Sequence, residues 1–450
     1  MNPRRPDPSA VPGSVRFPLA ERALPLRPRL QAPAGPTRAS ATPASTQRRH
    51  PQNWPLYLFL FLIPLQNLQT GYLPNIGAGL NFLNVMFLLA WVGAWFSGAR
   101  LARNEPVNRW VLAYALYGVV SLFVASAHVA DAGDHFQMLK DQLIGLFVLY
   151  LVQMSVGDWS TARRVLLVTL LPLPYIARVI WSQHNSVSRW HYSDDLRISG
   201  TFSMLGANEF AAFCVTVAVV LFAVLIAARM PNRWRIALAA GVACMVLGVL
   251  YAYSRTAYIA LLLGLVTVIL AWRGRWKLML PLLLGAALLP GALPQSVMER
   301  FDSTSVDEGE RDESTEMRFV YWELAWDNFK RNPVVGTGFH TFTHPEYNPY
   351  GMDTHNLYLR TLSEGGLIGF TLLLGVLLSV FTTARRELTR SPTGSLRYAL
   401  ALGLIGAWMA LVCGNLSGDR FTHYPMIAFF WVYVAMVVKG RHLPPEAPPR

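Results

Sequence analysis

The chain has 450 residues, of which 53% are hydrophobic and only 14% are charged. A soluble domain carries roughly 25% charged residues, so this composition excludes an ordinary soluble protein. The net charge of +13 would suggest a nucleic-acid partner in a soluble protein. In a membrane protein, arginines retained on the cytoplasmic side account for it, and we expect no nucleic-acid binding. Three widely spaced cysteines, Cys214, Cys244 and Cys413, indicate neither a disulfide framework nor a zinc site.

The first segment, residues 1–53, is rich in Pro, Ala and Arg and poor in large aliphatic residues. Such a composition cannot bury enough apolar surface to fold, so we expect a disordered, basic cytoplasmic tail. The segment is also too long and too rich in proline for the start of a signal peptide. The apolar stretch from Trp54 onward is therefore predicted to remain in the mature chain as a membrane span.

Apolar stretches near 20 residues recur along the rest of the chain, and each is long enough to cross roughly 30 Å of hydrocarbon as a helix. The stretches are continuously apolar rather than alternating, which favours helices over a barrel. The sequence therefore predicts an all-α, polytopic integral membrane protein with about 12 transmembrane helices, near residues 54–71, 77–97, 108–128, 138–156, 163–182, 208–228, 234–252, 255–272, 276–293, 355–383, 397–415 and 422–438.

Arginines in alternate short connections predict the orientation of these helices. Five such connections carry basic residues. Four are 98–107, 229–235, 273–277 and 385–397, and the fifth is 157–162, whose arginines, Arg163 and Arg164, open the next span. The positive-inside rule puts them in the cytoplasm, together with the N-terminal tail and the C-terminal tail 439–450. The loops 183–207 and 294–354 then lie outside, which in a Gram-negative inner membrane is the periplasm.

The predicted domains follow from this topology: helices one to nine over 54–293, a periplasmic loop subdomain over 294–354, and helices ten to twelve over 355–438. The loop has an acidic run at 307–316, which we interpret as a solvated segment. After this run, apolar residues recur at the period of a helix and predict an amphipathic helix at the membrane surface; they are Phe319, Trp322, Ala325, Trp326 and Phe329. Asn332-Pro333 is expected to end this helix.

Several polar residues on the predicted outer side break the positive-inside pattern. Arg197 lies in an outer loop, Arg255 in a very short outer connection, Arg178 near the outer end of a span, and His355 where a span begins. Each has a structural alternative: Arg255 could snorkel to lipid phosphate, Arg197 could pair with a neighbouring aspartate, and Arg178 could hold two helices together. His355 could be a neighbour of a helix cap formed by Thr354, without chemistry of its own.

Together these residue types suit one kind of chemistry. Guanidinium groups match the oxygens of a diphosphate, because their forked N–H groups bind two oxygens at once. A neutral histidine nearby can accept a proton from a hydroxyl group at neutral pH. The set therefore predicts the displacement of a lipid diphosphate by an alcohol.

Two motifs then make the chain resemble a known family. His355-Asn356, nine further residues and Gly366-Leu367-Ile368-Gly369 resemble the His-[Asn/Ser/Gln]-x9-Gly-x-x-Gly signature of O-antigen ligases. The upstream pattern Arg318…Trp322…Ala325…Asn332-Pro333…Gly336-Thr337-Gly338 is similar to the wider superfamily of O-antigen ligases, O-antigen polymerases and bacterial protein O-oligosaccharyltransferases. The motifs cover roughly residues 195–380.

The resemblance implies a specific activity. O-antigen polysaccharide on undecaprenyl diphosphate would be the donor and lipid A–core oligosaccharide the acceptor, in an inverting, metal-independent glycosyltransferase of the GT-C type without a cofactor. By motif, His355 would be the general base, and Arg197 and Arg255 would hold the diphosphate. Supporting candidates are Arg178, Arg318, His340 and Asn356. Gly366 and Gly369 would permit close helix packing.

The alternatives are an O-antigen polymerase, a protein O-oligosaccharyltransferase and, from a different class, a transporter. A transporter should have polar or broken helices near the midplane, whereas the polar residues here gather at one face. A metal site built from His340, His344 and His355 is conceivable, but the "HTFTH" segment lacks the glutamate of a metalloprotease helix. The first outer loop also lacks the acidic pair of metal-dependent oligosaccharyltransferases. We therefore expect no metal.

Overall fold

The computed structural model describes residues 51–73, 75–77, 80–126, 133–186, 196–278 and 313–444. Residues 1–50 of the predicted tail, most of the predicted span 276–293 and most of the acidic run 307–316 lie outside these residues, whereas Asn53 is buried and bonds to Ala90 and Ser155. The remaining predicted spans and loops lie wholly or partly within the described residues.

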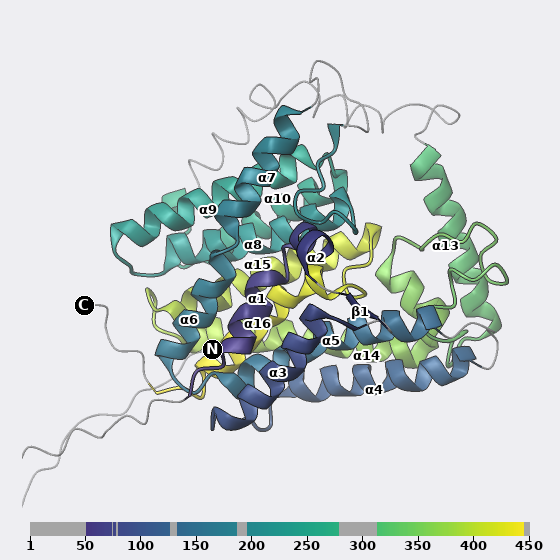
Figure 1. The fold of residues 1–450 in the computed structure, drawn as a ribbon, viewed down its shortest axis with the longest axis horizontal. Coiled ribbons are helices and arrows are strands. Elements are labelled where there is room, and N and C mark those ends of the chain that lie inside the picture. The colour runs from purple at the N-terminus through teal and green to yellow at the C-terminus, as the bar shows by residue number, and fades with distance from the viewer. Residues whose placement is uncertain are drawn as a thin grey trace, which may run out of the picture. The chain divides into compact units, whose positions relative to one another are not determined.

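The described residues are mostly helical (Figure 1). The helices and strands are α1 (Trp54–Leu62), α2 (Gln66–Tyr72), β1 (Asn75–Gly77), β2 (Leu80–Asn81), α3 (Phe82–Phe96), α4 (Pro106–Ser126), α5 (Gly133–Ser155), α6 (Trp159–Leu170), α7 (Leu173–Asn185), α8 (Ala207–Ala227), α9 (Asn232–Tyr251), α10 (Arg255–Ala271), α13 (Glu313–Arg331), α14 (Leu357–Arg390), α15 (Leu396–Gly414), the 3-10 turn η2 (Asn415–Ser417) and α16 (Tyr424–Gly440). The two short strands pair antiparallel.

The helices confirm a polytopic, helical membrane protein. Within the described residues, seven helical segments are long and apolar enough to cross a membrane, namely 106–125, 133–155, 159–185, 207–227, 232–251, 357–390 and 396–417. The shorter helices α3, α10 and α16 are also apolar. The predicted first span is instead two short helices, because the chain turns at Pro64, whose carbonyl accepts a hydrogen bond from Thr201 Oγ1 at 2.6 Å.

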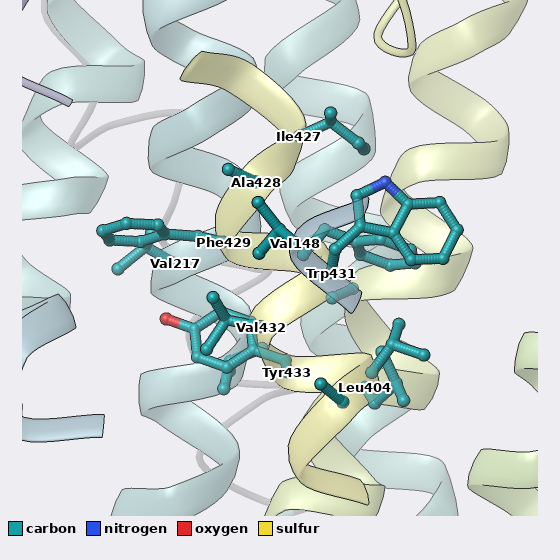
Figure 2. Close-up of a cluster of buried hydrophobic side chains, with 14 of the residues drawn as sticks. Val148, Val217, Leu404, Ile427, Ala428, Phe429, Trp431, Val432 and Tyr433 are labelled. Carbon is teal, nitrogen blue, oxygen red and sulfur yellow. The ribbon is translucent and has the colours of Figure 1, made fainter. Parts of the chain in front are cut away.

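Helix α16 lies at the centre of the hydrophobic core. Every residue of this helix is buried, including Phe429, Trp431 and Tyr433. Figure 2 shows these side chains among Val148 of α5 and Leu404 of α15. Because aromatic side chains bury large areas on several sides of one helix, α16 fixes the helices that carry the polar residues at its N-terminal end.

Helix α14 is broken at Gly366, where the backbone has φ 57° and ψ −160°. The loop after Pro333 packs into the break: Leu367 N–H donates to the Pro333 carbonyl at 2.8 Å, and Thr337 N–H donates to the Ser363 carbonyl at 2.9 Å. A Cβ atom on Gly366 would lie 2.4 Å from the Val334 carbonyl oxygen. Close helix packing was therefore the wrong interpretation for Gly366, which instead admits a loop whose backbone pairs with the broken helix.

The interpretation of Gly369 as a packing residue agrees with its surroundings. A Cβ atom there would lie 3.0 Å from the ring of Tyr117, so the glycine lets α4 approach α14. Figure 1 shows α4 and α14 side by side. Tyr117 also donates a hydrogen bond to the Gly365 carbonyl at 2.7 Å and so pairs another backbone group at the break.

Helix α13 confirms the amphipathic helix expected after residue 317, although its buried face differs from the predicted one. Tyr321 and Ala325 are buried and form a small core with Phe342. Phe319 and Trp326 are about half exposed, at 53% and 47%. The helix packs against α14, and this contact selects which side of α13 is covered. A helical spacing alone gives the period of the apolar residues and does not identify the partner.

Candidate functional site

His355 lies in a tight turn at the start of α14. Its φ of 50° falls in the left-handed region, which is uncommon for residues other than glycine. Asn356 caps the helix, because its Oδ1 accepts hydrogen bonds from the backbone N–H groups of Tyr358 at 3.0 Å and Leu359 at 3.1 Å. Thr354 was therefore the wrong cap, and the role of Asn356 is to hold the turn that presents His355.

Two neighbouring segments hold the same turn. The indole N–H of Trp322 donates to the Thr354 carbonyl at 3.0 Å, which ties α13 to the turn. The amide of Asn356 donates to the Leu416 carbonyl at 3.1 Å, and Leu357 N–H donates to the Gly418 carbonyl at 3.1 Å. The strained conformation of His355 is thus fixed from both sides, as is common at functional sites.

Charged side chains surround His355, and we name them the His355 cluster: His355, Asp353, Arg318, Arg420 and Glu209. Arg318 Nη1 donates to Ser417 Oγ at 2.9 Å, and Arg420 pairs with Glu209 at 3.3 Å. Burial lowers the pKa of His355 below its ordinary value of 6.5, and the positive charges of Arg318 and Arg420 act in the same direction. Asp353 and Glu209 oppose this shift. His355 is therefore neutral at pH 7 and has a lone pair to accept a proton.

The structure brings Arg197 and Arg255 to the same end of the helix bundle. Arg197 Nη2 donates to Asn208 Oδ1 at 2.7 Å, next to Glu209 at the start of α8. Arg197 Nε donates to the Ala252 carbonyl at 3.3 Å, three residues before Arg255. Arg255 is the first residue of α10 and is half-buried. The predicted pairing of Arg197 with a neighbouring aspartate concerns residues outside the described part of the chain.

The four supporting candidates do not all lie near His355. Arg318 and Asn356 lie beside His355. Arg178 has an exposed side chain on α7, and within the described residues no hydrogen bond or ion pair joins it to His355, Arg197 or Arg255. His340 belongs to a different group of side chains.

That second group, the Arg360 network, consists of Arg360, Glu364, Asp419, Thr422 and His340. Arg360 Nε donates to Glu364 Oε2 at 3.0 Å, and Arg360 Nη1 donates to Asp419 and to Thr422 Oγ1. Arg360 Nη2 lies 3.4 Å from His340 Nδ1. The guanidinium is buried, and each of its three nitrogens has a partner, so the network is closed.

Burial and neighbouring charges also set the protonation of the side chains in the Arg360 network. Burial and, after it, the positive charge of Arg360 lower the pKa of His340 from 6.5 to about 3. Burial alone would raise the pKa of Asp419, but the Arg360 guanidinium and the Thr422 hydroxyl hold this pKa below its ordinary value. At pH 7 the carboxylate of Asp419 is therefore charged and paired, and His340 is neutral.

Metal ligation at His340 is disfavoured, because its Nδ1 faces the Arg360 cation. Among the described residues, no group of three or more His, Cys, Asp or Glu side chains has the arrangement of a metal site.

Sequence reasoning missed Glu209, Arg420 and Asp419. Arg420 lies in the short connection between the last two predicted spans, on the predicted outer side. It therefore breaks the positive-inside pattern in the same way as Arg197 and Arg255, and this signal could have identified it. Glu209 and Asp419 have no such signal, because only the fold brings them to these arginines.

The fold and the site define a polytopic membrane protein with a polar site at one end of its helices. Residues 240–374 match the family model described as O-antigen ligase. The match includes Arg255, Arg318 and His355 and ends before Arg420. It supports the resemblance drawn from the sequence motifs. No curated protein matches the chain.

Proposed function

We propose that this protein is an O-antigen ligase, an inverting glycosyltransferase that moves polysaccharide from undecaprenyl diphosphate to lipid A–core oligosaccharide. The observation that carries the proposal is the position of His355. It is a neutral, half-buried histidine in a fixed turn, it is surrounded by arginines, and it opens the signature motif inside the matched region.

The chemistry uses one base and one leaving group. The acceptor hydroxyl attacks the anomeric carbon of the donor sugar while His355 takes the hydroxyl proton. The new C–O bond forms on the face opposite the breaking bond, and undecaprenyl diphosphate leaves with the electron pair. The configuration at the anomeric carbon therefore inverts. A positioned general base contributes typically 10²–10⁴-fold to such a step.

Arginines at the start of α8 and α10 supply the complementary charge. As the donor bond breaks, negative charge grows on the phosphate oxygens, and Arg197 and Arg255 stabilise it. Donors fixed before the reaction are worth about 3–4 kcal/mol each in comparable sites. Arg197 is already fixed by Asn208 and the Ala252 carbonyl, which supports this role.

The wider arrangement we propose is a GT-C-type protein with about 12 spans in the inner membrane, both termini in the cytoplasm and His355 facing the periplasm. The arginines that gather at the opposite helix ends, among them Arg273, Arg397 and Arg441, support this orientation. A cavity of about 470 Å³ beside α2 and α5 is lined by amide and charged side chains including Gln69, Asn81 and Gln137, which suit a saccharide.

The test is deletion of the gene followed by analysis of lipopolysaccharide on a gel and of the lipid-linked pool. A ligase predicts loss of the whole ladder while polymer accumulates on undecaprenyl diphosphate. A single repeat unit remaining on the core would instead identify a polymerase. An unchanged ladder and lipid-linked pool would contradict both functions.

A further inference from the structure

Arg420 is a buried arginine whose hydrogen-bonding capacity is mostly unused. Its side chain is 6% exposed and makes one ion pair, from Nη1 to Glu209 Oε1 at 3.3 Å. Its Nε has no hydrogen-bond partner within the described residues. A guanidinium has five N–H donors, and a buried donor without a partner costs about 1–3 kcal/mol. By contrast, all three side-chain nitrogens of Arg360, in the neighbouring network, have partners.

The backbone around Arg420 holds the side chain in this position. Arg420 N–H donates to Asn415 Oδ1 at 2.9 Å, which fixes the start of the side chain. The guanidinium lies against Gly418, where an added Cβ atom would be 2.7 Å from Arg420 Cζ and would displace the end of the side chain.

Arg420 lies near the residues proposed to bind the donor. It borders a small, mostly apolar crevice of about 20 Å³ together with Thr216 of α8 and Thr256, the residue after Arg255. Its partner Glu209 follows Asn208, which holds Arg197. Glu209 is 25% exposed and lies in the first turn of α8, where the helix dipole stabilises its charge without Arg420. Its carboxylate can therefore give up the arginine without becoming a buried, unpaired charge.

We propose that Arg420 is a third guanidinium of the diphosphate site, and that the donor diphosphate replaces the Glu209 carboxylate as its partner. The inference rests on the proposed function and adds a binding residue outside the matched family region. Arg420 moves from one carboxylate oxygen to two phosphate oxygens, and its unused donors become paired. Glu209 then acts as the group that competes with the ligand.

The test measures the affinity of purified full-length variants for undecaprenyl diphosphate in detergent micelles by microscale thermophoresis. We expect Arg420→Lys and Arg420→Gln each to weaken binding by about tenfold or more, because lysine keeps the charge but loses the fork. Glu209→Gln should bind as tightly as wild type or more tightly, since the competing anion is gone. Arg441→Lys is the matched control, because Arg441 is also paired with a glutamate but lies at the other end of the helices.

The double variant Glu209→Gln/Arg420→Gln separates two explanations. If Arg420 only neutralises Glu209, the double variant recovers wild-type affinity and the proposal is overturned. If Arg420 binds phosphate itself, the double variant stays as weak as Arg420→Gln. Melting temperatures without ligand identify variants that misfold, and Arg420→Lys is the conservative variant for that case. Wild-type affinity in Arg420→Lys also overturns the proposal, whereas absence of binding by the wild-type protein would contradict the proposed function itself.

Discussion

The His355 cluster and the Arg360 network lie on either side of the first turn of α14, and they differ in how completely their charges are paired. Arg360 bonds to Glu364, Asp419, Thr422 and His340. The His355 cluster is looser at Arg420, where the described residues give one ion pair, at 3.3 Å, and His355 lies in a strained turn. A closed network stabilises a fold, whereas a cluster with spare donors is ready to bind an anion.

Adjacent residues divide between the two groups. Asp419 faces the Arg360 network and Arg420 faces His355, so one short turn connects a structural group to a binding group. Phe421 N–H donates to Asp419 Oδ1 at 2.9 Å and stiffens that turn. The comparison predicts that substitutions on one side change stability and that substitutions on the other side change activity.

The largest expected effect is a loss of stability from a substitution in the Arg360 network. Arg360→Met removes the cation and leaves two buried carboxylates, which should cost about 3–5 kcal/mol of folding free energy. The measurement is the melting temperature in detergent, with Arg390→Met, exposed on the same helix, as the control. Substituting Glu364→Gln and Asp419→Asn together with Arg360→Met should recover much of the loss. Equal melting temperatures for Arg360→Met and wild type would contradict a structural network.

For the arginines proposed to bind the diphosphate, we expect substitutions to reduce activity without reducing stability. Arg197→Lys and Arg255→Lys should each reduce the transfer rate by about tenfold or more, which corresponds to about 1.4 kcal/mol of transition-state binding. Rates are compared at equal membrane abundance. Arg273→Lys, at the opposite helix end, is the control and should be silent. If all three lysine variants transfer at the wild-type rate, Arg197 and Arg255 are structural and the donor site lies elsewhere.

The helical, polytopic class of this fold follows from the sequence, because long apolar segments determine membrane helices. The position of His355 at a helix start also follows, from the polar cluster that precedes an apolar run. The break at Gly366 does not follow, since a glycine inside an apolar segment is equally compatible with close packing. The partners of Arg360 and Arg420 depend on Asp419 and Glu209, which are remote in sequence. Their pairing is a property of the assembled helices.

A smaller effect concerns pH. The neutral form of His355 is the one that accepts a proton, and its pKa lies below 6.5. The transfer rate should therefore rise with pH through a value below 6.5 and be constant by pH 7. Asp353 raises this pKa, so Asp353→Asn should move the rise to a still lower pH. A rate that falls between pH 5 and pH 7 would be inconsistent with a neutral base.

The smallest expected effect is that of metal removal. The Arg360 cation faces His340, and Arg318 and Arg420 beside His355 repel a divalent cation, an effect that Asp353 and Glu209 offset only in part. Excess EDTA should leave the rate of the purified reaction unchanged. Loss of activity in EDTA, with recovery on adding one particular divalent ion, would establish a metal-dependent mechanism.

The two histidines give the most direct test of the comparison, because both are neutral at pH 7 and each belongs to one group. The measurement is the single-turnover transfer rate of purified His355→Asn and His340→Asn with saturating donor. Asparagine is chosen because it tolerates the left-handed backbone that both residues have. We predict that His355→Asn binds donor but loses about 10²–10⁴-fold in rate, while His340→Asn keeps most of the rate and loses stability. Wild-type transfer by His355→Asn, together with lost transfer by folded His340→Asn, would contradict the account.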